Sequence, residues 1–479
     1  MAEKDSKLIE NSEEDHTKPF RLNRFPRLLI FVVFFFIHMF NCSDGGIPSA
    51  SSNKIKEELQ INDTQFGTYG SVVQIGRVIG TFVVMILLNF FNRKYVIFIA
   101  LLVKCSSFLI YLVTSNYMII FTFRFIQGLS HVFTYVYFPA WVDQFGLQKF
   151  KTLMTSFIQI ASPIGSVFGF TLTTFAGQKN WKWAFATLAF CILPLNAILF
   201  FVPAKYFSPS IFFASGIPDE ERGQGKPSLF EYDEEKQKKK EQDKSNASKG
   251  PSKWLLLLKP AFITIVLARC VVMFTFMCIH YWIGDYYSNG LKLDEAKSKL
   301  LKSASYSTVS MFAPMLGSTL GSLICEKFGG YTKRISSFLC VIFAGLAGGS
   351  AFVLTIPDNV FYFTCALFAF FFFCNCMMPI LIGIGFSCVG KKQKIASYGV
   401  NSLMCTFLGN LPAPTVYGFL NDKFKKNNPR MAMRICTNCI WLSVLLSFIN
   451  FLCRKNEGEE EPEENKDIEL KDVDNKDGK

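Results

Sequence analysis

Long apolar stretches separated by short polar ones recur along this 479-residue chain. A helix needs about 20 mostly apolar residues to cross a bilayer, because its backbone groups must be hydrogen-bonded within the segment. The pattern predicts about twelve such helices, at residues 28–50, 65–89, 95–114, 117–142, 152–176, 183–203, 260–287, 303–325, 335–356, 360–388, 396–420 and 434–453. We therefore predict an all-α polytopic membrane protein.

The apolar stretches fall into two sets of about six, with acidic, amide, proline and glycine residues at corresponding positions. Asp44 and Asp285 each close the first stretch of a set and lie 241 residues apart. Further pairs have nearly the same offset: Asn89 with Glu326, Pro139 with Pro379, and Pro163 and Gly169 with Pro412 and Gly418. These offsets indicate two pseudo-symmetric six-helix bundles, the layout used by alternating-access transporters.

The domain boundaries follow from where the apolar stretches begin and end. We expect a cytoplasmic N-terminal segment at 1–27, a six-helix bundle at 28–203, a charged cytoplasmic linker at 204–259, a second six-helix bundle at 260–453 and an acidic cytoplasmic tail at 454–479. Most of the linker contains too few apolar residues to bury a core.

Basic residues gather in the loops on one side of the predicted membrane, among them Arg24, Arg27, Arg93 and Lys94. The positive-inside tendency places this side, with both termini and the linker, in the cytoplasm. One hairpin on the other side disagrees, since it carries Lys423, Lys425, Lys426, Arg430 and Arg434. Either the upstream helices override these charges or the last helices are miscounted, and we favour the first explanation.

A glycosylation sequon begins at Asn62, on the predicted outer side. The membrane itself is either the plasma membrane or an endolysosomal or vacuolar membrane.

Composition excludes several classes of protein. With 50% hydrophobic and 18% charged residues the chain is too apolar for an ordinary soluble protein. The net charge of +13 is spread over membrane-flanking loops, which favours contact with anionic lipids over nucleic acid. Most of the 15 cysteines stand alone in apolar helices, so we expect no metal site and no cofactor. The sequence shows neither a phosphate-binding glycine loop nor an enzyme nucleophile motif, and we expect no enzyme.

An ionisable side chain inside a membrane helix is costly unless it faces a partner or a cavity, so each one marks a candidate site. Arg124 and His131 share a polar face of the fourth helix, and Arg269 and His280 share a face of the seventh. The candidate substrate-binding or coupling residues are Asp44, Arg77, Arg124, His131, Arg269, His280 and Asp285. Lys104 is expected to pair internally or to extend toward the membrane surface.

Small residues indicate where helices approach closely. Gly76 and Gly80 form a GxxxG step in the second helix, and Gly317 and Gly321 form another in the eighth. Prolines at matched positions, Pro163 and Pro412, should bend or loosen the fifth and eleventh helices.

Several segments match signatures of a known family. Residues 89–95 (Asn-Phe-Phe-Asn-Arg-Lys-Tyr) resemble the loop signature between helices 2 and 3 of the major facilitator superfamily. Residues 124–128 resemble its helix 4 signature, residues 162–165 with Gly169 its helix 5 signature, and residues 326–330 match more loosely. Residues 41–44 resemble a helix 1 element of the spinster-like branch. The residues expected to carry conformational motifs are Asn89, Arg93, Lys94, Gly128, Pro163, Gly165, Gly169, Glu326, Pro412 and Gly418.

The resemblance implies a cavity lined mainly by helices 1, 4, 7 and 10 that opens alternately to each side. It also implies transport, by symport or antiport, of a lysolipid, a sphingolipid or another small organic solute. We expect Asp44 to be a proton-linked acid that pairs with Arg124, with His131 able to share this role. Three intramembrane arginines favour an anionic or zwitterionic substrate, and we expect a monomer.

Four departures from the family pattern leave the substrate open. Asn89 replaces the loop acid and Phe90 the arginine that follows it. Gly45 replaces the arginine after the helix 1 acid, and His131 replaces a helix 4 glutamate. The alternatives are an uncoupled facilitator of sugars or organic acids, and a receptor or scaffold on a transporter fold. In a receptor or scaffold the charged linker and tail would be the functional parts.

Overall fold

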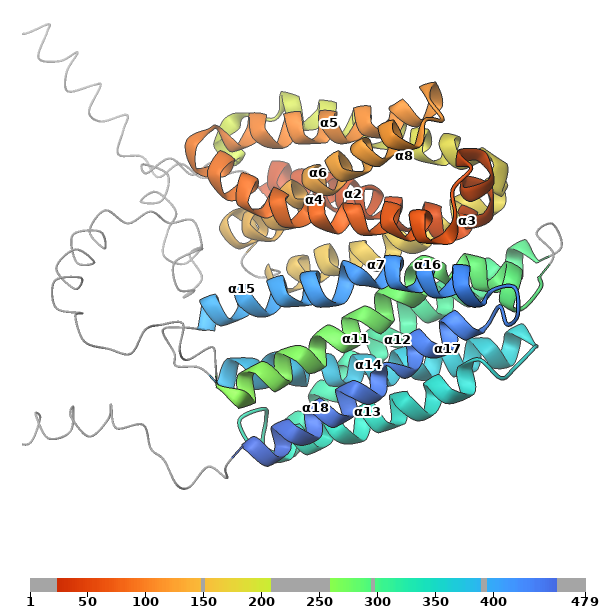
Figure 1. Ribbon diagram of the computed structural model, residues 1–479. Coiled ribbons are helices and arrows are strands. Elements are labelled where there is room, and N and C mark those ends of the chain that lie inside the picture. The colour runs from red at the N-terminus through yellow and green to blue at the C-terminus, as the bar shows by residue number, and fades with distance from the viewer. Residues whose placement is uncertain (1–23, 148–150, 208–258, 294–297, 389–393, 455–479) are drawn as a thin grey trace, which may run out of the picture. The chain divides into compact units, whose positions relative to one another are not determined.

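The computed structural model describes residues 24–147, 151–207, 259–293, 298–388 and 394–454 (Figure 1). Nearly all of the predicted N-terminal segment, linker and acidic tail lie outside these residues. The described chain divides into two compact units. Unit 1 comprises residues 1–248, 280–303 and 414–422, and unit 2 comprises residues 249–279, 304–413 and 423–479.

The early helices of the chain form the main part of unit 1. They are α2 (Arg24–Cys42), the 3-10 turn η1 (Ser43–Gly45), α3 (Gly46–Leu59), α4 (Asp63–Phe90), α5 (Arg93–Val113), α6 (Tyr117–Phe145), α7 (Lys151–Ala176), η3 (Gln178–Asn180), α8 (Trp181–Phe201) and η4 (Ala204–Tyr206). Within this unit α4 lies against α6 and α5 against α8 (Figure 1).

The later helices form unit 2, apart from two stretches that belong to unit 1. They are α11 (Pro260–Asp285), the π-helix η6 (Tyr286–Gly290), α12 (Lys299–Lys327), α13 (Ile335–Leu354), α14 (Val360–Ser387), α15 (Lys394–Met404), the π-helix η8 (Cys405–Asn410), α16 (Pro412–Phe424), α17 (Met431–Asn438) and α18 (Ile440–Cys453). α13 packs against both α14 and α18 (Figure 1).

Eleven helical segments of the described chain are long and apolar enough to cross a membrane. The twelfth predicted helix, at 396–420, is helical too, but η8 interrupts it between α15 and α16. Pro412 and Pro414 have no backbone N–H to continue α-helical hydrogen bonding, and the Leu411 N–H instead bonds the Thr406 carbonyl at 2.9 Å. The predicted all-α membrane fold is confirmed, and the break lies beside the proline expected to loosen this helix.

The first predicted helix, at 28–50, is shorter than the helical region in the structure. The chain is helical from Arg24 to Leu59, with η1 inside and non-helical backbone angles at Ser51. The polar run that suggested a loop includes Ser51, Ser52 and Lys56, and all three are buried. A polar segment can continue a membrane helix when its side chains find partners inside the protein.

A capping box sets the start of α4. The Asn62 side chain accepts a hydrogen bond from the Gln65 N–H at 2.7 Å, and the Gln65 side chain accepts one from the Asn62 N–H at 3.0 Å. This reciprocal pair satisfies N–H groups that have no partner within the helix. The predicted sequon residue Asn62 is therefore exposed but engaged as a helix cap.

The predicted glycine contacts between helices are present. A Cβ atom on Gly76 of α4 would lie 2.3 Å from the Phe125 carbonyl of α6, and one on Gly128 of α6 would lie 2.2 Å from the Val73 carbonyl of α4. Only glycine permits two backbones to approach this closely.

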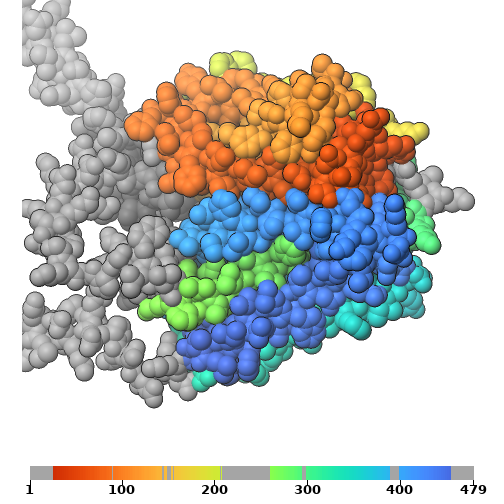
Figure 2. Space-filling view, in the orientation of Figure 1, coloured from red at the N-terminus to blue at the C-terminus, as the bar shows by residue number. Residues whose placement is uncertain are grey.

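Many large apolar side chains of the described helices remain exposed. Among them are Phe82, Met85, Phe190, Phe361 and Trp441. Figure 2 shows one face of these helices in space-filling form. Exposed apolar surface of this extent fits contact with lipid.

The basic hairpin between α16 and α17 lies beside the turn between α13 and α14. Arg430 pairs with Asp358, and the Arg434 side chain donates to the Thr355 hydroxyl at 3.0 Å. Both contacts lie within unit 2. The predicted count places this hairpin and this turn on the same side of the membrane, so the last helices are not miscounted.

Candidate functional site

Asp44 lies in η1, the short turn between α2 and α3, and is only 1% exposed. Helix α7 approaches this turn closely. A Cβ atom on Gly169 would lie 1.9 Å from the Ser43 carbonyl, and one on Gly165 would lie 2.1 Å from the Met39 carbonyl. These two predicted motif glycines therefore let α7 support the backbone that carries Asp44.

Lys104 of α5 is the nearest cationic partner of Asp44. Its Nζ lies 2.8 Å from Asp44 Oδ2 and also donates to the Gln127 carbonyl at 3.3 Å. Lys104 is 1% exposed, so it does not extend toward the membrane surface. A buried lysine is stable as a cation only with a close counter-charge, and Asp44 supplies it.

Arg124 of α6 contacts Asp44 from another helix. Its Nη1 lies 3.8 Å from Asp44 Oδ2, and its Nη2 donates to the Asp44 carbonyl at 3.2 Å. Nη1 also donates to Gln127 Oε1 at 2.8 Å, and the guanidinium lies 5.1 Å from the centre of the Tyr69 ring. The expected Asp44–Arg124 pair is thus present, with Lys104 closer to the acid.

Gln127 links the cluster to the surrounding helices. Its Nε2 donates to the Tyr111 hydroxyl at 2.8 Å and to the Ser107 carbonyl at 3.0 Å. Its amide oxygen accepts from Arg124, and its carbonyl accepts from Lys104. Gln127 therefore fixes both cations in place.

The Asp44 cluster, defined as Asp44, Lys104 and Arg124, holds one acid and two bases. Arg77 of α4 acts electrostatically on both Asp44 and Lys104, which adds further positive charge. Buried charge without a counter-charge is strongly unfavourable. The cluster is therefore suited to accept an additional negative group.

Some polar atoms around the cluster are buried without a hydrogen-bond partner among the described residues. They include Nε of Arg77, Nε of Arg124 and Nδ1 of His131. The predicted residues Arg77, Arg124 and His131 thus retain hydrogen-bonding capacity for a ligand.

His38 is a neighbour of this region that sequence reasoning missed. Its Nε2 lies 3.8 Å from Cys42 Sγ, and its ring centre lies 6.3 Å from that of His131. Its position in the first helix, one turn before Cys42 and close to Asp44, was the available signal.

The second-half residues do not join the Asp44 cluster. Asp285 pairs instead with Lys56, at 2.7 Å, in unit 1. The His280 carbonyl accepts from the Ser49 hydroxyl at 2.8 Å, also in unit 1. Arg269 lies in unit 2, where its Nε and Nη1 find no hydrogen-bond partner within the described residues.

Four residues expected in conformational motifs lie at helix ends. Asn89 is in the last turn of α4, and Arg93 and Lys94 begin α5. Glu326 is the residue before Lys327, the last residue of α12. The side chain of Asn92 caps α5 by accepting from the Lys94 N–H at 3.1 Å. Pro163 lies inside α7, and Pro412 begins α16.

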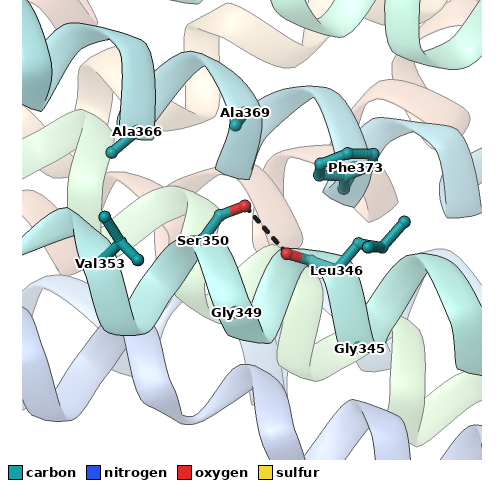
Figure 3. Close-up of a pocket in the computed structure, with 8 residues that line it drawn as sticks. All are labelled: Gly345, Leu346, Gly349, Ser350, Val353, Ala366, Ala369 and Phe373. Carbon is teal, nitrogen blue, oxygen red and sulfur yellow. Dashed lines mark hydrogen bonds between the residues drawn. The ribbon is translucent and has the colours of Figure 1, made fainter.

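A concavity of about 400 Å³ lies in unit 2 along α13 and α14 (Figure 3). It is lined by Gly345, Leu346, Gly349, Ser350, Val353, Ala366, Ala369 and Phe373. The hydroxyl of Ser350, its one polar side-chain group, donates to the Leu346 carbonyl at 2.9 Å. It offers no charged group and is therefore unsuited to recognise a charged solute.

The described residues contain no group of three or more His, Cys, Asp or Glu side chains placed to hold a metal ion. The charged groups of the Asp44 cluster are instead bonded to one another.

Comparison with solved structures identifies transporters of similar fold. The crystal structure of a bacterial homologue of the human lysosomal transporter Spinster, inward-facing and unoccupied, has a TM-score of 0.70 at 12% identity, over 90% of this chain and 98% of that one. Nucleoside transporter NupG has a TM-score of 0.64 at 13% identity, over 90% and 99%. A D-xylose–proton symporter has a TM-score of 0.63 at 14% identity, over 89% and 96%. These likenesses concern the fold.

A probable metabolite transport protein of Saccharomyces cerevisiae is 25% identical over 130 residues. That stretch is 27% of this chain and 27% of the yeast protein.

The family model of the major facilitator superfamily matches residues 32–414, which is most of the chain. The family consists of transporters and not of enzymes. The match includes helices of both sets and all three members of the Asp44 cluster. This chain therefore belongs to the major facilitator superfamily, as its sequence signatures predict.

Proposed function

We propose that this protein is a secondary transporter that moves an anionic or zwitterionic organic solute by alternating access. The observation that carries the proposal is the buried Asp44 cluster, in which two bases share one acid. A carboxylate or phosphate of the solute balances the second base when it binds. The Asp44 cluster then contributes to the substrate site within the membrane.

Proton coupling follows if Asp44 and the solute compete for the same bases. When the solute anion pairs with Arg124 or Lys104, Asp44 loses one of its two cationic partners and can take up a proton. When the solute leaves, the bases return to Asp44 and the proton is released. His131 can share this role, because its Nδ1 is buried without a hydrogen-bond partner among the described residues.

The family resemblance narrows the solute class. The spinster-like signature in residues 41–44, together with the structural likeness to a Spinster homologue, favours a lysolipid or sphingolipid. Lysophospholipids and phosphorylated sphingolipids carry an anionic or zwitterionic head group, which matches the positive cluster. We place both termini in the cytoplasm and the protein in the plasma membrane or an endolysosomal or vacuolar membrane.

A thermal-stabilisation screen tests the solute class. Purified protein would be heated with lysolipids, organic anions, amino acids and sugars, and unfolding would be followed by fluorescence. A ligand that binds only the folded state raises the unfolding temperature. We expect anionic or zwitterionic compounds to stabilise the protein and neutral sugars not to. Stabilisation by sugars alone would refute the anionic-site proposal.

Uptake into proteoliposomes then tests coupling. We expect wild-type uptake of the stabilising solute to depend on an imposed pH gradient, and Asp44→Asn to abolish that dependence while retaining exchange of solute. If Asp44→Asn kept the full pH dependence, Asp44 would not be the coupling acid.

An uncoupled facilitator is the second candidate, and one observation favours it. Lys104 and Arg124 both pair with Asp44. Two cationic partners stabilise the ionised form of Asp44, so the cluster can be a permanent structural ion pair. In that case wild-type uptake would follow the solute gradient and ignore pH. The same gradient assay separates the two candidates.

A further inference from the structure

A second buried ionic cluster lies in unit 1, at the junction between α3 and α4. Lys56 of α3 is buried, and its Nζ lies 2.5 Å from Asp63 Oδ1 and 2.7 Å from Asp285 Oδ1. The same ammonium lies 5.5 Å from the centre of the Trp282 ring. One cation therefore joins carboxylates from α4 and α11.

The side-chain amide of Asn421 contacts the second carboxylate oxygen of both acids. Asn421 Nδ2 of α16 donates to Asp63 Oδ2 at 2.9 Å and lies 3.4 Å from Asp285 Oδ2. Asn289 Nδ2 donates to Asp285 Oδ1 at 2.9 Å. Both buried carboxylates thus receive donors on both oxygens, the condition under which a buried charge is tolerated.

Asp422 of α16 binds the beginning of α4. Its carboxylate accepts from the backbone N–H groups of Asp63 at 3.0 Å and Thr64 at 2.8 Å, and from the Thr64 hydroxyl at 2.6 Å. The first N–H groups of a helix have no partner within it and favour negative charge. Asp422 supplies that charge from a distant part of the sequence.

The backbones beneath these side chains are in close contact. A Cβ atom on Gly418 of α16 would lie 2.3 Å from the Asp63 carbonyl, and one on Gly284 of α11 would lie 1.7 Å from the Ser49 carbonyl. The Tyr281 hydroxyl also donates to the Phe66 carbonyl at 2.7 Å. The ionic cluster therefore sits on a closely fitted helix contact.

All of these contacts join the early helices to residues of the later set. Residues 280–285 of α11 and 414–422 of α16 belong to unit 1, although both helices begin in unit 2. Alternating access requires helices of the two sets to move against each other. The contacts at the ends of α11 and α16 break if those ends move away from α3 and α4.

We infer that Lys56, Asp63, Asp285, Asn421 and Asp422 form a latch that holds α11 and α16 to α3 and α4 in one transport state and opens in the other. The inference rests on the proposed alternating-access function. Lys56 is the cation on which the latch depends, because it pairs with both Asp63 and Asp285. Without Lys56, Asp63 and Asp285 are two buried acids that repel each other.

Hydrogen exchange measured by mass spectrometry tests the latch without a known solute. The amides of Asp63 and Thr64 bond to Asp422, whereas the Gln65 amide bonds to its neighbour Asn62 and reports whether α4 itself remains folded. In full-length protein without denaturant, we expect residues 63–64, 280–290 and 412–424 to open together and more often than Gln65 and the middle of α4. Exchange of these segments only with the whole bundle would overturn the inference.

Substitutions sharpen the test. We expect Lys56→Met and Asp285→Asn to speed exchange at the Asp63 and Thr64 amides about tenfold or more while the Gln65 amide stays protected. Lys56 pairs with the side chain of Asp63, so the Thr64 amide, which bonds to Asp422, is the cleaner reporter of the two. Lys54→Met is the control, since Lys54 is on the same helix and forms a partly exposed pair with Glu57.

The outcomes separate the latch from the proposed function. Wild-type exchange rates in folded Lys56→Met and Asp285→Asn would refute the latch even if transport were demonstrated. Should Lys56→Met not fold, Asp285→Asn decides, because it keeps Lys56 paired with Asp63. Faster exchange in a protein that transports no solute would support the latch and contradict the proposed transport.

Discussion

The ammonium of Lys104 lies 2.8 Å from Asp44 Oδ2, nearer than the Arg124 guanidinium nitrogen at 3.8 Å. Both members of the Lys104–Asp44 pair are almost fully buried. The closest ionic contact of the Asp44 cluster is therefore made by Lys104, which is not among the candidate site residues predicted from the sequence. This arrangement makes Lys104 as important to the site as the arginine of the helix 4 signature.

Replacement of Lys104 by methionine should destabilise the protein strongly. The change keeps the volume of the side chain but leaves Asp44 with the more distant Arg124 alone, and breaking a buried pair costs about 3–5 kcal/mol. Thermal and denaturant unfolding in detergent would measure the loss. Lys179→Met, at an exposed lysine, should change stability little.

The double variant Asp44→Asn, Lys104→Met checks the cause of that loss. With both charges removed, no carboxylate is left with a single distant partner, and the double variant should be more stable than Lys104→Met alone. If the double variant lost as much unfolding free energy as the two single variants together, the two residues would not interact.

A methyl group at Gly169 should disturb the turn that carries Asp44. Its Cβ would lie 1.9 Å from the Ser43 carbonyl, so α7 or η1 must shift, and we expect a loss of about 1–3 kcal/mol in unfolding free energy. Gly45→Ala is the matched control, because Gly45 has helical backbone angles and no atom within 4 Å of the added carbon. Equal stability of the two variants would contradict the close contact.

Arg124→Lys should weaken binding of an anionic solute. The lysine keeps the charge but cannot supply the separate donors that Nη1 and Nη2 give to Gln127 and Asp44. Once the stabilisation screen has identified a solute, its dissociation constant should rise about tenfold, which corresponds to 1.4 kcal/mol. Arg434→Lys, at an exposed arginine, is the control, and an unchanged constant for Arg124→Lys would exclude Arg124 from the substrate site.

Arg454 should anchor the end of α18 in unit 2. Its guanidinium donates to the hydroxyls of Ser336, Ser337 and Ser387 and to the carbonyls of Tyr331 and Thr332. Loss of these charged hydrogen bonds in Arg454→Ala should cost about 1–3 kcal/mol in unfolding free energy. Lys423→Ala, at an exposed lysine, is the comparison, and a similar small effect of both would show that the Arg454 contacts contribute little.

The sequence by itself determined the number of membrane helices, their duplicated layout and the superfamily. These properties depend on runs of neighbouring residues: about 20 apolar positions specify a membrane helix wherever it packs. The close contacts of Gly76, Gly80, Gly317 and Gly321 were predictable for the same reason, because a GxxxG step places both glycines on one helix face. Asp44 and Arg124 stood out because charge is rare inside a membrane helix.

The sequence pointed to the pair of Asp44 with Arg124, but only the tertiary structure decided the other partners of the buried charges. Lys104 and Asp44 are 60 residues apart in the chain, and Lys56 and Asp285 are 229 apart. Such pairs depend on how each helix is rotated and how deeply it packs, which no local period encodes. For the same reason the polar end of the first helix looked like a loop: the partners that bury Lys56 come from distant helices.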